Sequence, residues 1–100
     1  MLESEFENIL EVRIDKIRET LKSKAKEYAT EDMLHNFKIA ARICDTTAEQ
    51  ALWGMASKHL VSIIDMVSDS KDRIPSHAMV DEKIGDMINY LILLEAVFLE

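Results

Sequence analysis

The sequence has few residues that interrupt regular structure or cross-link a fold. Its 100 residues include two glycines, one proline and one cysteine. A single cysteine excludes a disulfide framework within the chain and a cysteine-based zinc site. Apolar side chains recur at helical spacing, and no stretch of strand length alternates apolar with polar residues, so the sequence predicts an all-α fold. We expect Cys44 to pack as a small apolar side chain near a helix end.

Long basic and long apolar runs are also missing. The net charge is −7, and an acidic chain without a basic run has no electrostatic footprint for nucleic acid or for an anionic membrane surface. The longest apolar run, residues 90–94, is too short to cross a bilayer. The first residues lack the basic and apolar regions of a signal peptide, so we expect a cytoplasmic protein. The sequence has no GxGxxG, GxxxxGK[ST], HExxH or GxSxG motif.

The chain is rich in apolar side chains, which make up 48% of its residues. A domain of this length buries only around two-thirds of the surface that its unfolded chain exposes. We therefore expect a single domain, residues 1–100, whose core is completed by self-association. The spacing predicts a four-helix, bundle-like chain with helices over residues 4–28, 32–43, 48–67 and 77–100.

Local signals mark the beginnings of three of these helices. Ser4 and Glu7 have the spacing of a capping box, and Ser76 follows Pro75 at a position suited to cap the fourth helix. The third helix has two candidate capping pairs, Thr46 with Glu49 and Thr47 with Gln50.

The fourth helix carries the most functional information. Glu82, Asp86 and Asn89 follow at steps of four and three, so they stack on one face. Two carboxylates four residues apart repel each other unless a lysine, solvent screening or a divalent cation relieves them. The opposite face is the predicted core stripe, of which we expect the last three members to be buried within the chain or across a subunit contact: Val80, Ile84, Met87, Leu91, Leu94 and Phe98.

The acidic stripe has two readings. It is either a solvated polar face or the wall of a binding site, and the same line continues into apolar Leu93 and Val97. Beyond Tyr90 the helix is apolar almost all round, and such helices are usually buried. We therefore expect the stripe to lie at the mouth of a cleft or at an oligomer seam.

Other helices offer groups that could face this stripe. Lys58 and Asp65 are seven residues apart, on one side of the third helix, and are either surface residues or site residues. His59 lies on the apolar stripe and is either a hydrogen-bonded core residue or a ligand. Asn36 and Tyr28 lie at or near the junction between the first two helices, a good place to hold a base or a phosphate.

Several segments together resemble a group of small phage and prophage proteins related to the all-α nucleoside triphosphate pyrophosphohydrolases, the MazG-like superfamily. The resemblance covers about residues 20–98. The segments that carry it are 24–28 (KAKEY), 35–41 (HNFKIAA), 47–55 (TAEQALWGM), 58–67 (KHLVSIIDMV) and 81–90 (DEKIGDMINY).

The resemblance implies a Mg²⁺-dependent enzyme that splits a nucleotide between its α- and β-phosphates, and that assembles as a homodimer or homotetramer. Glu82 and Asp86 would then be metal ligands, with Asp65 a third ligand or the base that orients water. Lys58 would meet a phosphate. The pocket would be lined by Asn89, Asn36, His59 and Tyr28.

The chain departs from the pattern of this superfamily in two places. Glu82 and Asp86 are four residues apart rather than three, and the third helix has no ExxE motif. Two other functions therefore stay open, a nucleotide-binding relative without catalysis and a helical phage assembly protein without a small-molecule site.

Overall fold

The computed structural model describes residues 1–27 and 31–100, and four helices account for most of them. The helices are α1 (Glu3–Glu27), α2 (His35–Ile43), α3 (Ala48–Asp69) and α4 (His77–Leu99). No strand occurs in the described ranges, so the prediction of an all-α fold is confirmed for them. Helix α2 begins three residues later than predicted, where Asp32 Oδ1 accepts a hydrogen bond from the backbone N–H of Leu34 at 2.9 Å.

The capping signals succeed for two helices and fail for one. The hydroxyl groups of Thr47 and Ser76 each accept a hydrogen bond from the backbone N–H three residues later, at 3.2 Å and 3.1 Å. These bonds satisfy donors that the first turn of a helix leaves free. Helix α1 begins at Glu3, so Ser4 lies inside its first turn and does not occupy the predicted cap position.

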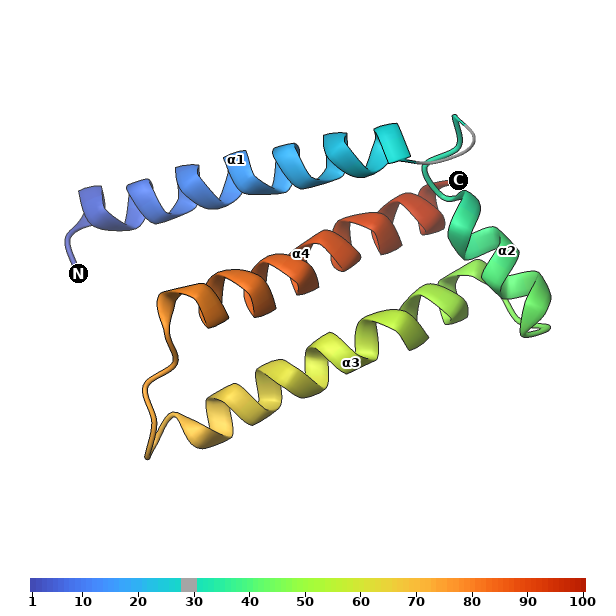
Figure 1. Cartoon of the computed structure of the whole chain (residues 1–100). Helices are drawn as coiled ribbons and strands as arrows, with labels where there is room; N and C mark the ends of the chain where they lie inside the picture. Colours follow the sequence, from blue (N-terminus) through green and yellow to red (C-terminus); the bar gives the residue numbers. More distant parts are fainter. Residues whose placement is uncertain (28–30) are drawn as a thin grey trace.

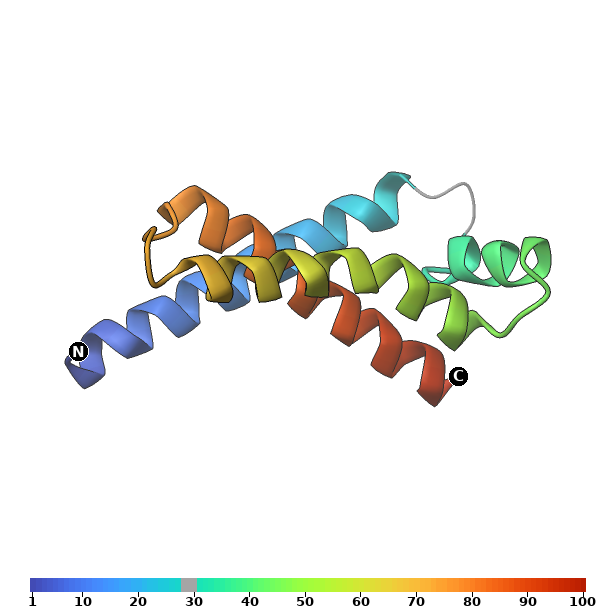
Figure 2. The same ribbon diagram turned by 90° about the horizontal axis from the view of Figure 1, so that it is seen from below.

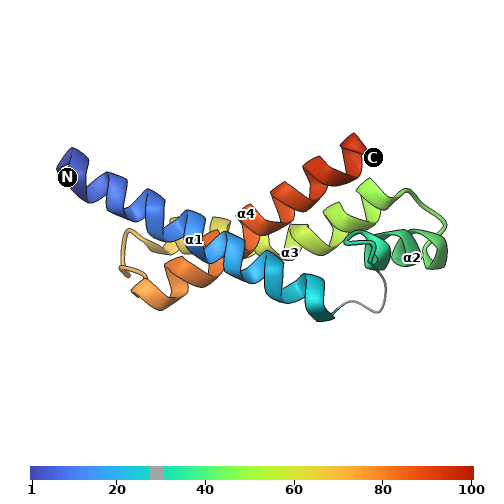
Figure 3. The same cartoon turned by 90° about the horizontal axis from the view of Figure 1, so that it is seen from above.

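The three long helices form a single layer with α4 in the middle (Figure 1). Helix α3 packs along one side of α4 and runs in the opposite direction, and the short α2 packs on α3 at the far end of the layer (Figure 2). Helix α1 lies on the other side of α4 and crosses it near its middle (Figure 3). In the described parts of the chain α1 and α3 do not pack on each other.

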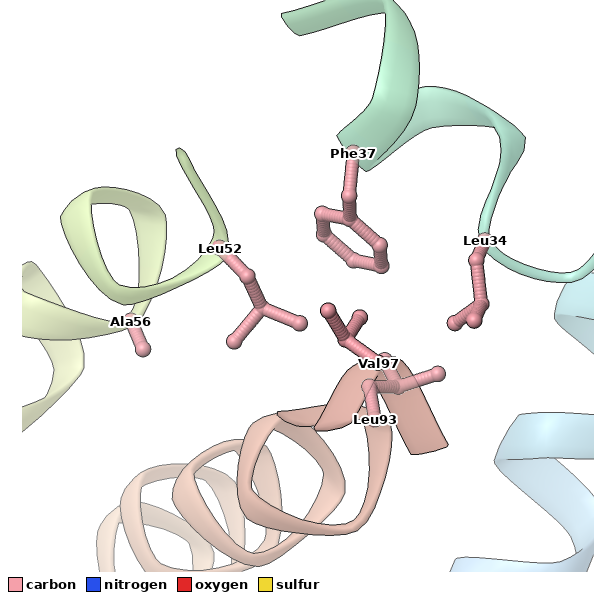
Figure 4. Packing of buried hydrophobic residues seen from close by; sticks show 6 residues of the cluster. All are labelled: Leu34, Phe37, Leu52, Ala56, Leu93 and Val97. Atoms are coloured by element: carbon pink, nitrogen blue, oxygen red, sulfur yellow. The ribbon is translucent and has the colours of Figure 1, made fainter. Parts of the chain in front are cut away.

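The apolar core lies where α2 folds over the first turns of α3 and the last turns of α4. Leu52 is completely inaccessible to solvent, and Phe37 and Val97 point toward it (Figure 4). The cluster consists of Leu34, Phe37, Leu52, Ala56, Leu93 and Val97. The apolar core therefore lies at one end of the layer, where α2, the start of α3 and the end of α4 meet.

Two members of the predicted core stripe of α4 are not buried within the chain, and their burial across a subunit contact stays a prediction. Leu91 is 47% exposed and Phe98 is 68% exposed, whereas Leu93 and Val97 are buried. Leu93 and Val97 therefore face the core that α4 shares with α2 and α3. The sequence did not predict this side, because an almost wholly apolar helix end gives no periodic signal to choose between its faces. Cys44 is also exposed, at the C-cap of α2, and does not pack as an apolar side chain.

The chain is more extended than a closed domain of its size. Its radius of gyration is 15.7 Å, against about 13 Å for a compact 100-residue domain. Its accessible surface is 7538 Å², about 1,700 Å² more than the roughly 5,800 Å² typical of a folded monomer of this mass. Part of the exposed surface is apolar. Among the described residues, no helix is long and apolar enough to span a membrane.

We expect Leu52→Ala to lower the free energy of unfolding by about 2–5 kcal/mol, because it leaves a cavity in the centre of the small core. Ile64→Ala is the matched control, since Ile64 lies on the same helix and is 53% exposed; its cost should stay below about 1 kcal/mol. Urea denaturation followed by circular dichroism measures both. Equal losses for the two variants would contradict the position of the core.

Candidate functional site

A polar contact holds α1 to α4 where the two helices cross. Asp81 Oδ1 lies 2.8 Å from Arg13 Nη2 and 3.0 Å from Lys16 Nζ. The Arg13 guanidinium lies close to the backbone of α4 at Gly85, since a Cβ placed there would lie 2.7 Å from Arg13 Nη1. A side chain at position 85 would therefore require the guanidinium of Arg13 to shift.

The ion pairs alter the titration of the shared carboxyl group. Hydrogen bonding from Lys16 is the largest cause that lowers the pKa of Asp81 below its usual value. Burial opposes it, and hydrogen bonding from Arg13 adds to the lowering. Because two cations share one carboxylate, this end of the crossing keeps a net positive charge.

A pocket of about 300 Å³ opens beside the crossing, between α1 and α4. The acidic stripe of α4 is part of its wall, so Glu82, Asp86 and Asn89 do come together on one concave surface as expected. The lining residues are Arg13, Lys16, Ile17, Glu19, Thr20, Asp81, Glu82, Gly85, Asp86 and Asn89.

Asn89 is the most unusual residue of this pocket. It is only 8% exposed, and its Oδ1 is buried without a hydrogen-bond partner among the described residues. An unpaired buried polar atom costs roughly 1–3 kcal/mol, so such atoms are rare in folded proteins unless a water, an ion or a ligand satisfies them. The amide oxygen of Asn89 is thus an open acceptor in the pocket wall.

Charge is distributed unevenly around the pocket. Arg13 and Lys16 lie with Asp81 at one end, while Glu19, Glu82 and Asp86 add three carboxylates to the lining. The pocket therefore combines a cationic spot with an acidic wall. A ligand that carries both an anionic group and a bound cation would complement both parts.

His59 reaches Asp86 from the other side of α4. Its Nδ1 lies 3.6 Å from Asp86 Oδ2, and its ring packs on that of Tyr90 with a centroid distance of 5.0 Å. The 3.6 Å separation is longer than a hydrogen bond, and His59 is not part of the pocket lining. Its position is that of a largely buried residue that supports Asp86 from α3.

The remaining predicted site residues do not meet at this pocket. Lys58 and Asp65 are exposed on α3 and Asn36 is exposed on α2, and none of the three lines it. Tyr28 lies outside the described residues. The expected convergence of Asp65 with Glu82 and Asp86 is thus not seen within one chain.

The oxygen donors of the pocket suit a hard cation only in part. Glu82, Asp86 and the amide of Asn89 are the donor types that Mg²⁺ prefers. In the described ranges, however, no three His, Cys, Asp or Glu side chains gather closely enough to hold a metal ion by themselves. A cation at this wall would need further ligands from water or from a bound substrate.

The sequence did not predict the pocket wall that α1 contributes. Arg13, Lys16 and Glu19 belong to an amphipathic helix and have no motif of their own. One signal was available, because Gly85 is a glycine within α4 and the Arg13 side chain lies against it.

Comparison with known proteins identifies no relative, since no family model, curated protein or solved structure matches the chain. The assignment of function therefore depends on the geometry and chemistry of the chain itself.

We expect the two glycines to respond differently to alanine. Gly54→Ala should stabilise the protein by about 0.5–1 kcal/mol, because helical alanine is favoured and the added Cβ meets open space. Gly85→Ala should lack most of that gain, since its Cβ displaces Arg13 from the crossing. Thermal denaturation compares them. An equal gain for both would show that the close approach of α1 at Gly85 is not maintained.

The lowered pKa of Asp81 predicts a pH dependence with a definite sign. The Asp81 carboxylate stabilises the fold while it is ionised, and this contribution is lost as the pH falls below about 4, through its lowered pKa. Asp81→Asn should therefore be less stable than the wild type at pH 7, and the difference should shrink on acidification. Urea titrations of both proteins between pH 7 and pH 3 test this. A difference that is constant over the range would contradict it.

Proposed function

We propose that the protein binds a Mg²⁺-complexed nucleoside triphosphate in the α1–α4 pocket and splits it into a nucleoside monophosphate and pyrophosphate. The observation that carries the binding part is the unpartnered, buried amide oxygen of Asn89 beside two carboxylates of the same face. The hydrolytic part is supported by the resemblance of residues 20–98 to the MazG-like superfamily.

Glu82 and Asp86 would hold the cation in this proposal. Mg²⁺ is usually bound by one or two carboxylates together with substrate phosphates and waters, so the absence of a third protein ligand among the described residues is compatible with it. When bound, the ion would neutralise phosphate charge and make a coordinated water a better nucleophile. Asn89 would accept a hydrogen bond from the nucleotide or from a coordinated water.

Arg13 and Lys16 would receive the phosphates. Both side chains line the pocket, and they share a single carboxylate, so one positive charge is left to compensate an anion. Asp65 and Lys58 are not included in the binding set of one chain, because they lie outside the pocket lining.

Calorimetric titration with Mg²⁺ tests the proposal. We expect weak binding of Mg²⁺ alone and tighter binding when a non-hydrolysable nucleoside triphosphate is present, because the phosphates complete the ligand set. Asp86→Asn should weaken the ternary complex about tenfold or more. The control is Glu95→Gln, since Glu95 is exposed on the same helix outside the pocket. Identical heats for both variants would remove Asp86 from the site.

Asn89→Leu separates binding from folding in the same experiment. Replacing an unpaired buried polar group with an apolar one of similar size should leave the free energy of unfolding unchanged or raise it. Loss of nucleotide binding together with retained stability would support the role of Asn89 as an acceptor. Unchanged nucleotide binding would refute it.

A second function, self-assembly without a small-molecule site, is favoured by the surface of the chain. The surface beyond that of a compact monomer, about 1,700 Å², is enough for an extensive protein contact. If the wild type binds neither Mg²⁺ nor nucleotide in the titration above, assembly becomes the better account of the molecule.

A further inference from the structure

The apolar face of α1 is covered over only part of its length. Between Arg13 and Lys24 the face that includes Ile17 is partly buried against the rest of the chain. The same face continues toward the N-terminus, where the described residues leave it largely exposed, although Ile9 shares an open groove with Ile74 and Val80. Its exposed members are Leu2 at 67%, Phe6 at 59%, Ile9 at 51% and Leu10 at 47%.

The charges of α1 are divided between its two halves. Residues 3–12 carry four glutamates and no basic side chain, whereas residues 13–27 carry six basic side chains and three acidic ones. Along one flank, three acidic side chains and then three basic ones each recur at steps of four. Each acidic position has a basic counterpart at the same distance on the other side of the midpoint between residues 14 and 15. The members of this flank are Glu3, Glu7 and Glu11, and then Arg18, Lys22 and Lys26.

The arrangement has a favourable and an unfavourable part for α1 by itself. Acidic side chains in its first turn and basic ones in its last turn complement the helix dipole. Like charges four residues apart on a helix destabilise it by a few tenths of a kcal/mol per pair, and both halves contain such pairs. None of the six side chains takes part in a salt bridge within the described residues, and all six are exposed. A neighbouring helix with the opposite order of charges would relieve both halves at once.

We propose that two copies of this chain pair through α1, antiparallel, about a two-fold axis between residues 14 and 15. In this register Glu3 faces Lys26 of the second copy, Glu7 faces Lys22, and Glu11 faces Arg18. The two-fold symmetry repeats each of the three contacts. The reversed order of charge thus identifies the occupant of the exposed α1 face as a second copy.

The apolar side chains fit the same register. Leu21 of one copy lies level with the space between the partner's Phe6 and the partner's Leu10. Leu21 also borders an open, mostly apolar groove of about 570 Å³, whose other walls are the segment 32–34 and the end of α4. The uncovered first half of one α1 thereby covers this groove in the other copy, where Ile92 and Leu99 are exposed.

Alternative pairings of α1 fail on charge. A parallel pair sets acidic half against acidic half, and an antiparallel pair of the first halves alone also places glutamates opposite glutamates. Like charges brought together in this way are unfavourable. A standard interface buries about 800 Å² per partner, and the whole chain has roughly twice that in surface beyond a compact monomer.

The pairing is independent of the proposed ligand site. None of the six flank residues lines the α1–α4 pocket, so their variants leave the pocket side chains in place. Failure of the dimer and failure of ligand binding are therefore separate results.

Sedimentation equilibrium of the wild type and of two charge-reversal variants tests the proposal. The first variant, E3K/E7K/E11K, makes the flank entirely basic, and the second, R18E/K22E/K26E, makes it entirely acidic. We expect a wild-type dimer and a dissociation constant about a hundredfold higher or more for each variant by itself, as six favourable pairs become repulsive. Circular dichroism of each variant checks that the helices are retained.

Mixing the two variants is the decisive measurement. Every basic position of one then faces an acidic position of the other, so we expect a heterodimer of near wild-type affinity that weakens as salt is raised. Three outcomes would overturn the proposal. They are a strictly monomeric wild type, dimers that persist in both separate variants, and variants that stay monomeric when mixed.

Discussion

Helix α4 packs on α3 along one side and on α1 along the other, and the arrangement of the layer depends on these two different contacts. Toward α2 and α3 it presents Leu93 and Val97, which are buried with Leu52 in the apolar core. Toward α1 it presents Asp81 and Gly85 at a polar contact, and Leu21 of α1 packs at the edge of the apolar core. Burial of apolar surface is a far stronger source of stability than an exposed ion pair. The α2–α3–α4 unit is therefore the more stable part of the layer, and α1 is held to it by a weaker contact.

The helices themselves were largely predictable from the sequence. Thr47 and Ser76 are capping residues whose signals are local, so the starts of α3 and α4 agree with prediction. The orientation of α4 was not predictable by periodicity, because its last turns are apolar on every side. Which side is buried is decided by where α2 folds over α3, and that depends on the packing of Phe37, which is remote in sequence.

The candidate site was half predictable, for a related physical reason. Glu82, Asp86 and Asn89 share one helix, so helical geometry alone brings them together. Arg13 and Lys16 reach the same pocket only through the crossing of two helices that are far apart in the chain. The sequence contains no periodic trace of such a crossing. The same limit applies to Asp65, whose helix was expected to face the stripe and which instead points to solvent from α3.

The contact between Arg13 and Asp81 spans 68 residues of sequence, and this separation has a kinetic meaning. The contact of α2 with the end of α4 is almost as distant in sequence, since Lys38 and Glu100 are 62 residues apart. Contacts between distant residues form late, since the chain must first give up the entropy of a long loop. Docking of α1 onto α4 is therefore one of two steps that close a long loop, beside the contact of α2 with α4. Until it occurs, the wall formed by Glu82 and Asp86 has no opposite side.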